Sequence, residues 1–375
     1  MVCRFNAARL KEARLLRGLS QTEVADLLDV TKQAVSQYEN GVVVPRGDIE
    51  IKMAEILNMP LTYFSMQDSN AIKTPIFFRS RKTSAKKMQN KYRIYINWVV
   101  DIYLYISDKI KLPKAKLIKK CQEKYSLDEI AAVAKELRAY WGLGNGPISN
   151  LTLLLENNGF IIAKIPMHFE KVDACSVFFT NIDREKNRPM IFLTSNISAV
   201  RLRRDLAHEL GHQVLHSWMD EETLEANRDD IEKEAELFAS CFLMPTDAME
   251  REAFSVVSAD SLLYLKQRWG ASAQSILYHL RDLDLIKNAL FDKLRNDIYR
   301  RRWRNHEPFD DKIAQEKPEL IKDAIKLLVD AGVKTAADIA DDISFPVNDL
   351  AELCGIPKDF FQSRELEKPM LRLVK

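Results

Sequence analysis

Residues 200–216, VRLRRDLAHELGHQVLH, decide how the centre of this 375-residue chain is built. The stretch predicts a helix over about 198–217. His208 and His212 lie one helical turn apart on it, so both imidazoles project from the same face. Two imidazoles so arranged suit one Zn²⁺ ion, and Glu209 beside them is placed to take a proton from a metal-bound water. Zn²⁺ is therefore the cofactor that the sequence predicts.

A catalytic zinc site needs a third protein ligand, with a fourth position left open for water. His216 lies two turns beyond the first histidine, about 12 Å along the axis, so we expect it to pack or to hydrogen-bond a ligand. The next predicted helix, 229–243, has a buried stripe that Glu234 joins, whereas Glu232 and Glu236 are expected to face outwards. A carboxylate on a buried face needs a partner, and a metal is a good one. Glu234 is the predicted third ligand, with Glu232 as the alternative.

Gly211 lies inside the predicted metal-binding helix, where glycine costs about 1 kcal/mol relative to alanine. We therefore expect another element to approach the helix closely at this position. The surrounding side chains suit a buried helix, because they are small or apolar: Leu206, Ala207, Leu210 and Leu215.

Three strand-like runs precede this helix, at 160–165, 174–179 and 189–194. They predict a small mixed or antiparallel sheet beside the metal-binding helix. An extended substrate could add to an edge of such a sheet, and we expect the edge at 189–194.

A second motif lies near the N-terminus, in LSQTEVADLLDVTKQAVSQYENG at 19–41. Ser20 and Glu23 form a predicted capping box at the start of one helix. Thr31 can cap the next helix, which extends from Lys32 to Glu39. Two short helices joined by a tight turn constitute a helix-turn-helix unit.

This segment resembles the phage-repressor-like (Xre) family of DNA-binding regulators, over about 60 residues. The resemblance implies a recognition helix in the major groove of a double-stranded DNA operator. Four side chains that point away from its core would then meet base edges: Lys32, Gln33, Ser36 and Gln37. Gln21, at the start of the preceding helix, would hold a phosphate. A helical module used only for protein contacts is the alternative interpretation.

The charge distribution bears on this choice. Residues 1–67 hold eight basic and eight acidic side chains, so the helix-turn-helix segment is neutral. Residues 72–93 hold eight basic side chains and no acidic ones, and they could supply phosphate contacts. A solvated linker is the alternative for that stretch.

HELGH at 208–212, followed by EKEAELFASCFLMP at 232–245, resembles the ImmA/IrrE metallopeptidases, over roughly 145–250. In that family two histidines and a later glutamate bind zinc. The resemblance therefore implies His208, His212 and Glu234 as ligands and Glu209 as the base. Glu236 departs from the family pattern, which usually has asparagine there.

These motifs predict a predominantly helical α+β protein in four parts. They are a helix-turn-helix domain at 1–67, a basic linker and helical connector at 68–145, a metallopeptidase core with a zincin-type HExxH helix at 146–250, and a helical C-terminal extension at 251–375. Within the connector, residues 94–105 suggest an amphipathic helix that packs on the core. No apolar run approaches the ~20 residues of a membrane span, so we expect a cytoplasmic protein without membrane contact.

The leading hypothesis is a DNA-binding transcriptional regulator with a zinc endopeptidase domain. The family resemblance points to a repressor- or antitoxin-like protein as the substrate, or to self-cleavage. The alternative is a non-catalytic transcription factor whose zinc site is structural or sensory. A homodimer is expected from the symmetry of helix-turn-helix binding.

Overall fold

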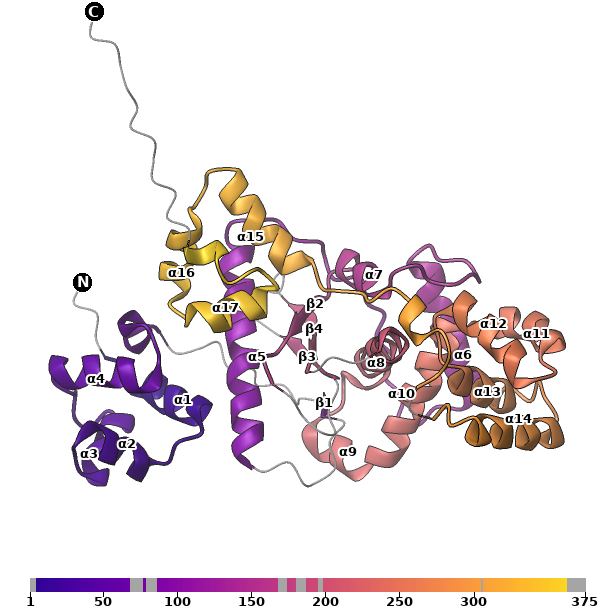
Figure 1. Cartoon of the computed structure of the whole chain (residues 1–375), viewed down its shortest axis with the longest axis horizontal. Coiled ribbons are helices and arrows are strands. Elements are labelled where there is room, and N and C mark those ends of the chain that lie inside the picture. The colour runs from indigo at the N-terminus through magenta and orange to yellow at the C-terminus, as the bar shows by residue number, and fades with distance from the viewer. Residues whose placement is uncertain are drawn as a thin grey trace, which may run out of the picture.

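A computed structural model of the chain describes residues 5–67, 77–78, 86–167, 174–179, 187–194, 198–304 and 306–362. Helices surround one small sheet (Figure 1), so the predicted α+β, predominantly helical class is confirmed. Within these ranges, no helix is long and apolar enough to span a membrane.

The N-terminal helices begin and end where the local signals predict. Ser20 and Glu23 form the capping box of α2, and the Thr31 side chain accepts from the backbone of Ala34 at the start of α3. Gly18 ends α1 in the left-handed region, at φ 71°. The four helices are α1 (Ala7–Arg17), α2 (Gln21–Leu28), α3 (Lys32–Glu39) and α4 (Gly47–Leu57).

Helix α5 (Lys86–Ser107) stands between the N-terminal helices, the sheet and the C-terminal helices (Figure 1). Trp98 stacks on Phe345 at 4.3 Å between ring centroids, and Tyr63 meets the same indole edge-on at 5.8 Å. The amphipathic helix expected over 94–105 is therefore present, and it packs on the N-terminal and C-terminal helices as well as on the core. Most of α5 from Tyr92 to Ile106 is buried, whereas Arg93, Asn97, Asp101 and Leu104 are more exposed and share one side of the helix, as in an amphipathic helix.

The sheet has the strand order β1-β3-β4-β2. β4 pairs parallel with β2 and antiparallel with β3, and β1 pairs antiparallel with β3. The expectation of an open edge at 189–194 is wrong, because β4 lies between two other strands. The strands are β1 (Phe77–Phe78), β2 (Ile161–Lys164), β3 (Ala174–Phe179) and β4 (Arg188–Leu193).

Helix α8 (Ala199–Gly211) packs against α10 (Arg228–Leu243), which lies beside it in Figure 1. A Cβ atom on Gly211 would lie 3.1 Å from Cδ1 of Phe238 and 3.2 Å from Cα of Ala235. The close approach predicted at this glycine is thus confirmed. A π-helical turn, His212–His216, follows α8 directly. The remaining helices of this region are α6 (Leu127–Tyr140), α7 (Leu151–Asn157) and α9 (Glu221–Ala226).

The C-terminal helices form two groups (Figure 1). The first group lies beside α6 and α10 and comprises α11 (Thr246–Glu252), α12 (Ala259–Trp269), α13 (Ala273–Asp282) and α14 (Asn288–Arg300). The second group packs near α5 and comprises α15 (Leu320–Asp330), α16 (Ala336–Ile343) and α17 (Val347–Cys354). A buried ion pair between Arg203 and Glu316 fixes the connection between them to α8.

Candidate metal centre and DNA-reading helix

The two motif histidines meet at the end of α8. Nε2 of His208 lies 3.1 Å from Nε2 of His212, and each residue is 2% exposed. Their rings are nearly perpendicular, at 87°. The helical spacing therefore brings two imidazole nitrogens to one point, as the sequence predicts.

Glu232 of α10 supplies a carboxylate to this point. Its oxygens lie 3.4 Å from Nε2 of His208 and 3.7 Å from Nε2 of His212. One atom from each of the three residues forms a group whose members all lie within 4.8 Å of one another. Ligands at 2.0–2.2 Å from a tetrahedral Zn²⁺ stand about 3.3–3.6 Å apart, and the separations of 3.1, 3.4 and 3.7 Å lie close to that range. The outward-facing orientation expected for Glu232 is wrong.

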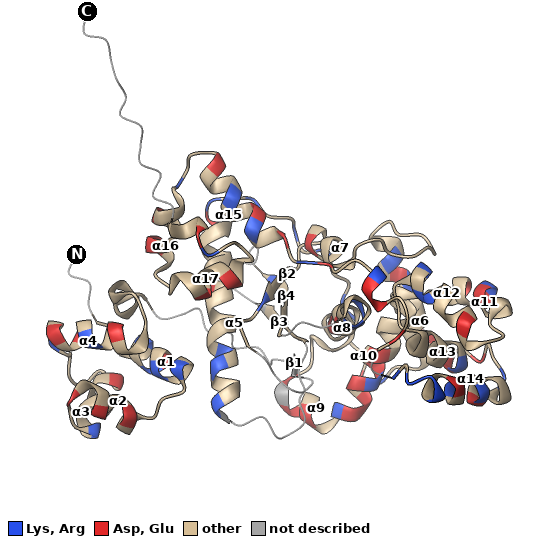
Figure 2. Ribbon diagram, viewed as in Figure 1, with Lys and Arg blue, Asp and Glu red and all other residues tan. Residues whose placement is uncertain are grey.

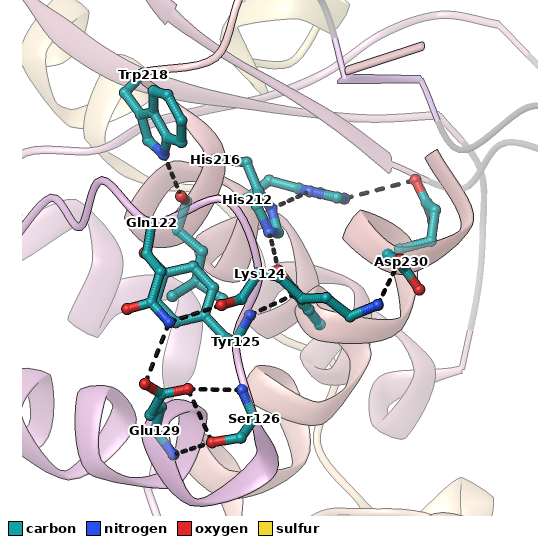
Figure 3. A network of polar contacts seen from close by, with 12 residues as sticks. Gln122, Lys124, Tyr125, Ser126, Glu129, His212, His216, Trp218 and Asp230 are labelled. Atoms are coloured by element: carbon teal, nitrogen blue, oxygen red, sulfur yellow. Dashed lines mark hydrogen bonds and ion pairs between the residues drawn. The ribbon is translucent and has the colours of Figure 1, made fainter. Parts of the chain in front are cut away.

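Glu234, the predicted third ligand, lies outside this group. Its Oε2 is 3.0 Å from Nε2 of His216, and its Oε1 accepts from the backbone N–H of Tyr125 at 2.8 Å. Side chains two positions apart leave an α-helix about 200° apart, so Glu232 and Glu234 cannot share a target. The burial of Glu234 was predicted correctly, but its partners are a histidine and a peptide group. Figure 3 shows His212, His216 and Tyr125 within this network.

Glu236, one turn after Glu232, also faces the pair rather than pointing away from it. Its Oε2 lies 3.6 Å from Nδ1 of His208, and its Oε1 accepts from Nε of Arg204 at 2.7 Å. Burial acts to lower the pKa of His208, but Glu232 and Glu236 beside it raise that pKa to about 9. The site thus stabilises positive charge at these nitrogens. The four-residue spacing of Glu232 and Glu236 was the signal that could have revealed both.

Glu209, the predicted base, points into the protein between α8 and the sheet. Burial raises the pKa of its carboxyl to about 7, and Ser176 of β3 lies beside it. No hydrogen bond reaches its Oε2 from the described residues. A carboxyl group with a pKa near neutrality can exchange protons at physiological pH, which suits a general base.

The recognition-helix candidates lie along α3. Lys32 and Gln33 are exposed, whereas Ser36 and Gln37 are half-buried. Gln21 lies at the start of α2, and its Nε2 donates to Glu39 at 2.8 Å. A phosphate contact by Gln21 would therefore use the second N–H of the same amide.

Part of the basic stretch 72–93 lies on α5, beside the helix-turn-helix. A Cβ atom on Gly18 would lie 2.5 Å from Cε of Lys87 and 3.1 Å from Cε of Lys91. Figure 2 shows basic residues at this end of α5. The predicted phosphate contacts from 72–76 and 79–85 concern residues outside the described ranges.

Comparison with known families agrees with both motifs. Residues 10–64 match the family model described as helix-turn-helix, and residues 165–281 match the one described as IrrE N-terminal-like domain. This chain joins those two domains. Among known proteins, one from Pyrococcus furiosus, named as a candidate HTH-type transcriptional regulatory protein, is 38% identical over 58 residues. That match covers 16% of this chain and 18% of the relative.

The helix-turn-helix domain is thus a DNA-binding module, and the IrrE N-terminal-like domain belongs to a metallopeptidase family. The second match ends at residue 281, so it includes α11, α12 and nearly all of α13 as well as the candidate metal centre. The helices α11–α13, which lie beside α10, therefore belong to the region that matches the IrrE N-terminal-like domain.

Proposed function

We propose that this protein is a DNA-binding transcriptional regulator with a zinc-dependent endopeptidase site. The observation that supports the peptidase most directly is the convergence of His208, His212 and Glu232. Two buried imidazole nitrogens at 3.1 Å with a carboxylate beside both form a donor set of the N, N, O type that binds zinc. A zinc ion bound there would supply Lewis acidity that polarises a peptide carbonyl and acidifies water.

The protein's own residues divide the remaining work. His208, His212 and Glu232 would hold the ion. In this ligand set Glu232 takes the place of Glu234, the ligand expected from the sequence. Glu209 would take a proton from the water whose oxygen attacks the carbonyl carbon. As the C–N bond breaks, Glu209 would return that proton to the leaving amine.

The substrate would bind along the outer edge of β3. β3 carries Ser176, which lies beside Glu209, and its edge away from β4 would accept an extended peptide by backbone pairing. β1 takes that position here, since Phe77 pairs with Ser176 and Phe78 pairs with Cys175. A peptide substrate would therefore replace this two-residue strand of the linker.

The DNA-binding half would read an operator through α3. Lys32, Gln33, Ser36 and Gln37 would reach base edges, and Gln side chains can pair bidentately with adenine. The substrate would be a repressor- or antitoxin-like protein, or this chain itself, in the cytoplasm. A homodimer would match a two-fold symmetric operator.

The experiment compares zinc-loaded wild type with Glu209→Gln on a proteome-derived peptide library, with new N-termini read by mass spectrometry. We expect cleavage by the wild type, a loss of at least ~100-fold in Glu209→Gln, and equal zinc content. If both proteins hold zinc and neither cuts any peptide, the non-catalytic alternative replaces the peptidase.

The DNA-binding half is tested separately by selection from a randomised duplex library. The wild type should enrich one sequence, and the pair Gln33→Ala and Gln37→Ala should lose that preference. Unchanged enrichment by the double variant would contradict the assignment of α3 as the recognition helix.

A further inference from the structure

A continuous line of polar contacts leads from the metal centre to the peptide backbone before α6. Nδ1 of His212 lies 3.1 Å from Nδ1 of His216, and Nε2 of His216 lies 3.0 Å from Oε2 of Glu234. Oε1 of Glu234 accepts from the backbone N–H of Tyr125 at 2.8 Å. His216 is fully buried and Glu234 is 5% exposed, so water does not compete with these contacts.

The donor and the acceptor of each hydrogen bond can be assigned by starting from Tyr125, at the end of the line away from the metal centre. The peptide nitrogen of Tyr125 can only donate, so Glu234 is an acceptor there, and an ionised carboxylate accepts at both oxygens. His216 must then carry its proton on Nε2, and as a neutral ring it accepts at Nδ1. His212 therefore carries its proton on Nδ1.

This order leaves Nε2 of His212 without a proton, on the side that faces His208 and Glu232. Only an imidazole nitrogen with a free lone pair can bind a metal ion. The other neutral tautomer would place a proton at the metal position. A buried ligand held in one tautomer does not have to rearrange when the metal binds.

We propose that His216 and Glu234 are positioning residues that fix the metal-binding tautomer of His212, with the peptide N–H of Tyr125 as the anchor. This inference rests on the proposed metal centre, because it assigns a role toward the metal to residues outside the ligand set. Glu234 lies outside the proposed ligand set, and this inference gives that buried carboxylate a function.

Glu234→Gln tests the relay with little change in shape. An amide cannot accept at both ends, so if its oxygen stays on Tyr125, its NH₂ group faces His216. His216 must then accept at Nε2 and donate from Nδ1, which forces the proton of His212 onto Nε2. We expect the Kd for Zn²⁺, measured with a competing chelator on the full chain, to rise 10- to 100-fold.

Glu156→Gln is the matched control. Glu156 is also a buried carboxylate that accepts from peptide N–H groups, those of Glu319 and Leu320, and it lies in α7. Its variant should bind Zn²⁺ as the wild type does. Equal loss in both variants would mean a general effect on the fold and would overturn the relay.

Histidine ¹⁵N NMR of the zinc-free protein provides a readout independent of affinity. The wild type should show His212 protonated on Nδ1, and Glu234→Gln should show it protonated on Nε2. If the wild type binds no Zn²⁺, the metal centre fails, but this spectrum still decides the tautomer. Unchanged tautomer and zinc affinity in Glu234→Gln would overturn the relay.

If Glu234→Gln does not fold, two substitutions of His216 replace it. His216→Asn retains an oxygen near the position of Nδ1 to accept from His212, so it should hold Zn²⁺ at least tenfold more tightly than His216→Phe. Equal affinities would show that His216 only fills space.

Discussion

Nε2 of His208 faces Nε2 of His212 at 3.1 Å where α8 gives way to a π-helical turn. Gly211 lies between the two residues and touches α10, the helix that carries Glu232. The glycine therefore sets the distance between the imidazole pair and its carboxylate. A helix packed this closely leaves no room for a methyl group on that face.

Gly211→Ala should destabilise the fold, although alanine is the better helix former. A new Cβ would lie 3.1–3.2 Å from Phe238 and from the backbone of Ala235, so the Phe238 ring and the α10 backbone must shift by a few tenths of an ångström. We expect a loss of about 1–3 kcal/mol in the free energy of unfolding, measured by urea denaturation. Gly47→Ala is the control, since nothing lies within 4 Å of its added Cβ. Equal stability of both variants would contradict the close contact.

The local elements of this fold could be predicted because short-range rules specify them. Ser20 and Thr31 mark helix starts through hydrogen bonds to residues three positions on. The three strand-like runs at 160–165, 174–179 and 189–194 match β2, β3 and β4 to within one residue at each end. The order of the strands in the sheet could not be predicted from the sequence. β2 and β3 follow one another along the chain, but β2 pairs with β4, and β3 pairs with the other side of β4.

The proposed metal centre was predicted in part. His208 and His212 share one helix, so their spacing alone brings them together. The choice between Glu232 and Glu234 depends on how α10 is rotated against α8, which no pattern within α10 reports. Burial was a misleading guide, because Glu234 is the more buried carboxylate yet it serves His216.

The stability of the fold should depend on pH through Glu156. Burial raises the pKa of Glu156 to about 7, despite the N–H of Leu320, so between pH ~4.5 and 7 the folded chain binds more protons than the unfolded chain. Stability from this group is therefore present at low pH and is lost as pH rises to 7, by about 3 kcal/mol. Glu156→Gln should lack this component in urea unfolding at pH 5 and 8. Parallel pH profiles for both proteins would contradict it.

Lys87 should strengthen binding to DNA of any base sequence. It lies beside Gly18, next to the start of the helix-turn-helix, and its ammonium group is available to a phosphate. Lys87→Ala should weaken binding to selected and random duplexes alike, and should reduce the slope of log K against log salt by about 0.9. A Gln33→Ala variant should instead weaken the selected duplex alone. Fluorescence anisotropy at several salt concentrations separates the two, and an unchanged slope in Lys87→Ala would place Lys87 away from DNA.

Removal of β1 from the sheet should make the proposed substrate edge more accessible. Proline has no N–H to donate, so Phe77→Pro with Phe78→Pro should release β1 from β3. We expect severalfold faster cleavage of a library peptide that the wild type cuts. Phe77→Ala with Phe78→Ala keeps both N–H groups and should leave the rate nearer to that of the wild type. Slower cleavage by the proline variant would mean that β1 supports the site rather than occupying it.

The metal-ligand assignment is tested most directly by Zn²⁺ binding to the wild type, Glu232→Ala and Lys233→Ala. Equilibrium competition with a chromophoric chelator gives both the stoichiometry and the Kd. We predict one Zn²⁺ per chain for the wild type and for Lys233→Ala, and a Kd at least ~100-fold higher for Glu232→Ala, since a charged ligand is lost. A wild type without Zn²⁺, or a Glu232→Ala variant that binds as tightly as the wild type, would contradict a centre built from His208, His212 and Glu232.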